Sequence, residues 1–158
     1  MRRVMIIGAA LGFAIGVPLA AMAASGGSSS SLDLQSSQWT TTAAQTSSSR
    51  FQSITALGGL NICATNQVTA TLSVELSGAA AGFQIRVDGG ALMQPGAVRF
   101  QPVVPHQSFS FTWVMNVSAF EANDHHVFDV EWRSPTVAPT KLERATLNLQ
   151  YQRGTHQC

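Results

Sequence analysis

Charged side chains are scarce in this 158-residue sequence, which has 9 Lys and Arg residues against 8 Asp and Glu, or 11% of the chain. An ordinary soluble domain has roughly 25% charged residues, so hydroxyl and amide side chains must supply most of the solubility here. The near balance of charge excludes a strongly basic nucleic-acid binder. Helical periodicity is also missing, which excludes a coiled coil, and the apolar runs are too few for a multi-pass membrane protein.

The N-terminus predicts export. Met1-Arg2-Arg3 is a positive start, an apolar stretch follows over 4–19, and Ala21-Met22-Ala23 offers the small-x-small pattern that signal peptidase recognises. The apolar stretch is shorter than the roughly 20 residues of a membrane-spanning helix, although a retained anchor is the alternative. We therefore expect residues 1–23 to be a removed signal peptide, no membrane span in the mature chain, and a secreted or periplasmic location.

Cysteine is almost absent, with one residue at Cys63 and one at Cys158. In an oxidising compartment the simplest use of this pair is one disulfide, which would tie down the last residue of the chain. It would close a loop of about 95 residues, worth roughly 4 to 5 kcal/mol on the chain-entropy model. The alternative is a soft-metal site of the two thiols and His156, but a close Cys-x-x-Cys pair is missing.

Large apolar residues, which a strand needs to form a buried face, are rare over 24–50. Runs of Ser and Thr dominate there, and Leu32, Leu34 and Trp39 are the exceptions. This composition predicts a flexible Ser/Thr-rich segment ahead of a folded domain over 51–158. Two roles are open for it. It could lie loosely as a first strand at the edge of the fold, or it could pair with a neighbouring molecule by strand addition.

Apolar and polar residues alternate along most of 51–158, as in strands with one buried and one wet face. The segments are 67–76, 83–87, 98–103, 108–117, 127–133 and 145–152, with shorter candidates at 51–54 and 60–64. Phe109, Phe111 and Trp113 lie at two-residue spacing, which predicts a strand in the middle of the fold. Seven or eight short strands separated by turn signals predict an all-β, immunoglobulin-like antiparallel β-sandwich.

Few residues suggest chemistry. His125 and His126 beside Asp124 could bind zinc or copper if His106 or His156 came close, but adjacent strand residues point to opposite faces, and a polar turn explains the group more simply.

Catalytic patterns are also missing. A Gly-x-Ser-x-Gly elbow is absent, and Lys141 is the one lysine. Asp129 and Glu131 share a face, but Arg133 follows on it, so a charge ladder explains all three. We predict no enzyme activity, no catalytic residue, and no resident metal or cofactor.

Outward faces made of hydroxyls and amides have little charge to keep two molecules apart. The function predicted from this surface is an exported, non-enzymatic protein with a structural, adhesive or surface-interaction role, which associates with itself or with a cell-surface protein. The alternative is a periplasmic or extracellular module that binds a ligand or metal through loop residues around His125 and His126.

Overall fold

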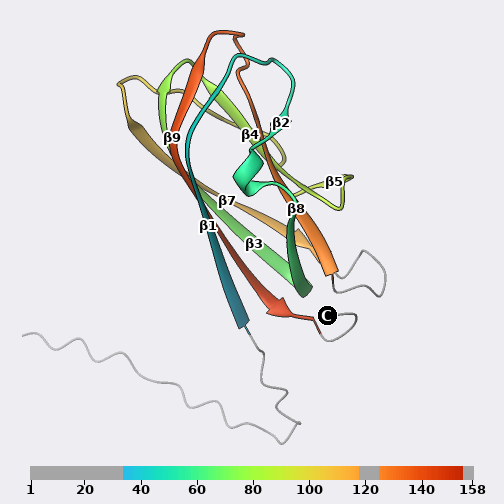
Figure 1. The fold of residues 1–158 in the computed structure, drawn as a ribbon. Coiled ribbons are helices and arrows are strands. Elements are labelled where there is room, and N and C mark those ends of the chain that lie inside the picture. The colour runs from blue at the N-terminus through green and yellow to red at the C-terminus, as the bar shows by residue number, and fades with distance from the viewer. Residues whose placement is uncertain (1–33, 118–124, 155–158) are drawn as a thin grey trace, which may run out of the picture. The chain divides into compact units, whose positions relative to one another are not determined.

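The computed structural model describes residues 34–117 and 125–154, which form antiparallel strands joined by turns and loops (Figure 1). In chain order the elements are β1 (Leu34–Thr46), β2 (Gln52–Ser53), the 3-10 turn η1 (Thr55–Leu57), β3 (Leu60–Gly78), β4 (Ala81–Val87), β5 (Ala91–Leu92), β6 (Val98–Phe100), β7 (Gln107–Asn116), β8 (His125–Arg133) and β9 (Thr140–Arg153). The predicted all-β class is confirmed, with nine strands in the described part. The predicted signal peptide, Asp124, His156 and Cys158 lie outside it. Within it, no helix is long and apolar enough to cross a membrane.

The strands form two halves that share β3. One half has the order β1-β9-β3-β7. In the other half, β8 lies between β4 on one side and both β2 and the start of β3 on the other, while β5 and β6 pair with β4. The inward side chains of both halves belong to a single hydrophobic core. The fold is therefore sandwich-like.

Strand β3 is long enough to serve both halves, because it joins two segments that were predicted as separate strands. Its residues 60–63 pair with β8, and 64–78 pair with β9. The register with β9 shifts between Thr65 and Val68. Asn66 lies at this bulge with φ +59°, a conformation that Asn tolerates, and its Nδ2 donates to Gln152 Oε1 at 2.7 Å. The bulge bends the strand without ending it.

The alternating pattern correctly identified most of the core. All five apolar residues of 67–76 that were placed on one face are buried, and so are the three inward residues of 127–133: Val68, Ala70, Leu72, Val74, Leu76, Phe128, Val130 and Trp132. Phe83 lies at the centre of an aromatic group, with its ring centroid 5.6 Å from that of Phe100 and 6.2 Å from that of Trp132. Dense aromatic packing of this kind fills a core that offers few charged groups.

The prediction that 108–117 lies in the middle of the fold is wrong. β7 is an edge strand, paired along its length with β3 and touched on its other side by the isolated bridge between Gln94 and Val114. Trp113 is fully buried, but Phe109 and Phe111 are only half-buried, because they lie at the edge of their half. Two-residue spacing shows that aromatics share a face, but it does not show how far the opposite layer extends over them.

Of the two roles open for the segment 24–50, the part that the structure describes takes the first, a strand at the edge of the fold. Residues 34–46 form β1, which pairs with β9 from one end to the other. Trp39 and Ala44 pack against the core, so two apolar side chains suffice to hold a strand of hydroxyl and amide residues on an existing sheet. Composition alone underestimates a strand of this kind, because β9 supplies the hydrogen-bonding partners that an isolated segment lacks.

Candidate interaction surfaces

Both edges of the β1-β9-β3-β7 half carry strands without a charged side chain. β1 reads LQSSQWTTTAAQT and β7 reads QSFSFTWVMN, and neither contains proline. Natural sheets protect long edges with lysine, proline, covering loops or bulges. On the outer side of β7, the bridge from Gln94 covers Val114, with hydrogen bonds of 2.9 and 3.0 Å. The outer side of 107–112, opposite β3, pairs with no strand among the described residues.

The outer surface of this half is a regular array, which we call the hydroxyl face. Its four rows of register neighbours run across β1, β9, β3 and β7 in that order: Ser36, Gln150, Thr69 and Val114; Gln38, Asn148, Thr71 and Thr112; Thr40, Thr146, Ser73 and Ser110; Thr42, Arg144, Glu75 and Ser108. Thirteen of the sixteen are Ser, Thr, Asn or Gln, and all sixteen are exposed or half-buried. The face therefore offers hydrogen-bonding groups over four strands and very little charge.

Hydroxyl groups of the hydroxyl face bond to each other across the strands. Thr71 and Thr112 share a hydrogen bond of 3.0 Å between their Oγ1 atoms, and Ser73 and Ser110 share one of 3.1 Å between their Oγ atoms. Cross-strand hydroxyl pairs stabilise an antiparallel sheet modestly. Each hydroxyl in such a pair keeps further hydrogen-bonding capacity, since a hydroxyl offers one donor and two acceptor sites.

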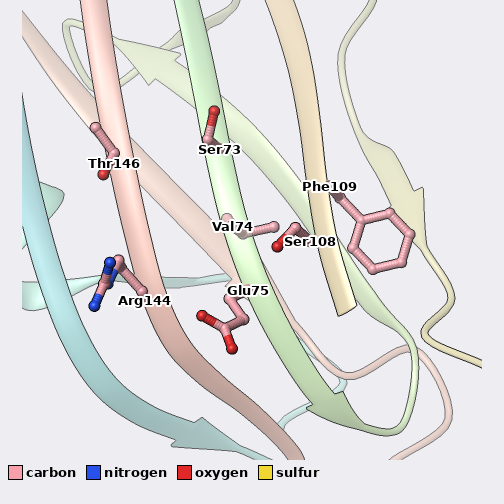
Figure 2. Close-up of a pocket in the computed structure, with 7 residues that line it drawn as sticks. All are labelled: Ser73, Val74, Glu75, Ser108, Phe109, Arg144 and Thr146. Atoms are coloured by element: carbon pink, nitrogen blue, oxygen red, sulfur yellow. The ribbon is translucent and has the colours of Figure 1, made fainter. Parts of the chain in front are cut away.

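A shallow depression of about 190 Å³ lies on the hydroxyl face. Figure 2 shows Arg144 of β9, Glu75 of β3 and Ser108 of β7 next to each other along one row. Its volume is below the range of roughly 300–1,000 Å³ that is typical of small-molecule sites. Glu75 is already engaged, since its Oε1 lies 3.4 Å from Nδ1 of the exposed His106. The depression does not have the dimensions of an enclosed binding pocket.

The structure separates the two adjacent histidines. His125 is exposed at the start of β8, whereas His126 is 2% exposed and points inward. Nδ1 of His126 lies 2.8 Å from Oδ2 of Asp88, whose Oδ1 accepts the Val127 N–H at 2.8 Å. Asp88, at φ +51° before Gly89 and Gly90, thus connects the β4–β5 turn to β8. Within the described ranges, no three His, Cys, Asp or Glu side chains gather as a metal site.

Cys63 lies beside the end of β9, close to where the C-terminal residues leave the sheet. The Gly154 N–H donates to the Cys63 carbonyl at 3.1 Å, and the Cys63 Sγ lies 3.4 Å from the Gly154 carbonyl oxygen. Cys158 follows Gly154 by four residues, and four residues can span roughly 13 Å. The pairing of Cys63 with Cys158 stays a prediction, since Cys158 is outside the described part; Gly154, the last described residue, lies beside Cys63.

The charge ladder expected for Asp129, Glu131 and Arg133 has different partners. The three share the outer face of β8 as predicted, but Glu131 accepts hydrogen bonds from Gln84 at 2.5 Å and from Nε of Arg86 at 3.1 Å, both from β4. Asp129 accepts the Gly59 N–H. The Arg133 guanidinium stacks instead on the ring of Phe51. Gln84 and Arg86 could not be predicted as partners of Glu131 from the sequence, because cross-strand neighbours depend on strand order.

These features define the class of protein: an all-β, sandwich-like domain with two uncharged edge strands and one broad hydroxyl face. Searches against protein-family models and against curated proteins find no match to the chain. Its function must therefore be argued from its own surfaces.

Proposed function

We propose that this protein is an exported, non-enzymatic structural protein with an immunoglobulin-like sandwich fold, and that it assembles with further copies of itself through strands β1 and β7. The observation that carries the proposal is that one sheet has two long edges, both free of charge and proline. Such edges are ready templates for strand pairing.

Strand directions support head-to-tail pairing. The sheet β1-β9-β3-β7 contains four strands and each neighbour pair is antiparallel, so β7 runs opposite to β1. A second copy in the same orientation would therefore place its β1 antiparallel to β7 of the first, and the sheet would continue with its alternation intact. A contact between two different patches leaves one of each patch free in a dimer, so further copies can add. The product is a ring if the rotation closes and an open filament if it does not.

Lysine substitutions along one row of the hydroxyl face test this proposal with matched controls. Thr40 on β1 and Ser110 on β7 lie on the edges, whereas Thr146 and Ser73 occupy the same row on the central strands β9 and β3. A lysine on an edge strand opposes strand addition. We expect Thr40→Lys and Ser110→Lys each to shift sedimentation velocity profiles from oligomers to monomers, and Thr146→Lys and Ser73→Lys to leave the oligomers in place.

A mixing experiment distinguishes head-to-tail pairing from symmetric pairing. Thr40→Lys leaves β7 intact and Ser110→Lys leaves β1 intact, so an equimolar mixture should form dimers and nothing larger. If either single variant alone still forms a dimer, the pairing is symmetric and the head-to-tail arrangement is wrong. If the unsubstituted protein is a monomer at all concentrations, self-assembly is refuted. If the central variants dissociate the oligomer equally, the hydroxyl face is the interface in place of the edges.

A further inference from the structure

Two arginines flank a glycine on the outer face of the other half of the fold. Gly82 of β4 is the register partner of Arg133 on β8 and of Arg99 on β6. Register partners point to the same side of a sheet, and the alternate residues Phe83 and Trp132 point into the core. The two arginine side chains thus rise from the same outer surface, on strands separated by two spacings of about 4.8 Å. Gly82 between them has no side chain, and the Phe51 ring lies beside it, 3.8 Å from the position that a Cβ would take.

Arg133 is held in place from two sides. Its guanidinium carbon lies 4.6 Å from the centre of the Phe51 ring, which is a cation–π contact. Its stem lies over Gly82, since a Cβ added at that position would be 3.4 Å from Cγ and 3.5 Å from Nε of Arg133. Glycine therefore provides the space that the arginine stem occupies, and stacking on Phe51 fixes the plane of the guanidinium.

The guanidinium held in this way lacks a hydrogen-bonding partner among the described residues. Nε of Arg133 is buried and unsatisfied, and the three ion pairs in the described part involve Arg86, His106 and His126 instead. A buried polar group without a partner calls for a bound water or ion. Arg99 is exposed and makes one weak side-chain bond, from Nη2 to Oε1 of Gln101 at 3.2 Å.

The two carboxylates that share the outer face of β8 with Arg133 are already engaged elsewhere. Glu131, two residues before Arg133 on β8, accepts hydrogen bonds from Gln84 and Arg86. Asp129 accepts the Gly59 N–H. Arginine at pH 7 is always charged, and its planar fork matches the oxygens of a carboxylate or a phosphate. The positive charge of Arg133 and Arg99 is therefore left for a group from outside the described fold.

We propose that Arg133, Arg99 and Gly82 form an oxyanion site, which binds a carboxylate or phosphate group between the two guanidiniums. Phe51 and Gly82 position Arg133 before the anion arrives, which lowers the entropy lost on binding. The site is built from residues of β4, β6 and β8 and uses none of β1 or β7, so it does not rest on the assembly proposed above.

Titration by nuclear magnetic resonance tests this site, with the side-chain Nε–H signal of Arg133 as the readout. The probes are inorganic phosphate and acetate, each compared with chloride at the same pH and ionic strength. We expect phosphate, acetate or both to shift this signal to saturation, and chloride to have little effect. A response to phosphate alone indicates a phosphoryl ligand, and a response to acetate alone indicates a carboxylate.

Variants complete the test. Arg99→Gln should weaken the response roughly tenfold, because one charge-assisted contact is lost. Arg144→Gln, an exposed arginine on the hydroxyl face, is the matched control and should leave the response unchanged. The proposal is overturned by an absent or non-saturating shift, by an equal effect of chloride, or by an unchanged response in Arg99→Gln. Backbone amide spectra confirm that each variant remains folded.

Discussion

Replacing Val137 by asparagine should stabilise the protein. Val137 lies in the connection between β8 and β9 with φ +63°, and its side chain is 62% exposed. The left-handed region is unfavourable for a β-branched residue. The turn holds it there through the Val137 N–H, which donates to the Ser134 carbonyl at 3.3 Å, so the backbone cannot relax without losing this bond.

The size of the effect follows from the backbone conformation and the exposure. A left-handed conformation costs roughly 1–2 kcal/mol for an ordinary L-residue. Asparagine adopts this region more readily than valine, so most of that cost is relieved. Little burial is lost, because the valine side chain is already largely in water. We therefore expect a gain of about 1 kcal/mol in the free energy of unfolding, which corresponds to a rise in Tm of about 4 °C for a domain of this size.

Urea and thermal denaturation of Val137→Asn and Val103→Asn provide the assay. Val103 is 80% exposed and is not among the residues with positive φ, so the same replacement there changes side-chain chemistry without relieving strain. We expect Val103→Asn to stay within about 0.5 kcal/mol of the parent protein. The reasoning is refuted if Val137→Asn gives no gain, or if both variants gain equally, since the cause would then be removal of an exposed valine.

Two further predictions concern the core and the disulfide. Phe83→Ala should lower the free energy of unfolding by about 3–5 kcal/mol in a urea titration, because this ring is fully buried. Phe111→Ala should lower it clearly less, because Phe111 is half-buried on the edge strand β7. Equal losses would contradict the assigned packing. The intact mass of the exported protein should rise by two hydrogens on reduction if Cys63 and Cys158 are paired, and alkylation of two thiols without reduction would show that they are not.

Several parts of the fold followed from local patterns. The alternation over 67–76 and 127–133 predicted which side chains are buried, because adjacent strand residues face opposite sides whatever the strand order. The same rule predicted that His125 and His126 point in different directions. Composition, in contrast, underestimated the Ser/Thr-rich residues of β1, which form an edge strand because β9 offers a partner. The alternation rule failed for Phe109 and Phe111, because an edge position depends on the extent of the opposite layer.

The candidate surfaces could not be predicted from the sequence, because they depend on which distant strands pair with each other. Arg99 and Arg133 are separated by 34 positions, and nothing in the chain indicates that both are register partners of Gly82. The hydroxyl face likewise combines residues from four strands, and its sequence signal was only the general scarcity of charge. Glu131 and Arg86 show the same limit, since proximity along β8 suggested Arg133 as the partner and the structure supplied a residue from β4.

The sequence by itself determined that the chain is all-β and which side of most strands is buried, since both follow from the two-residue repeat of an extended backbone. It also determined that charged side chains are few. Only the tertiary structure decided which strands lie at the edges, that β3 bends through both halves, and that Glu131 pairs with Arg86 and not with Arg133. The reason is that edges and partners depend on contacts between residues far apart in the chain, which local periodicity does not encode.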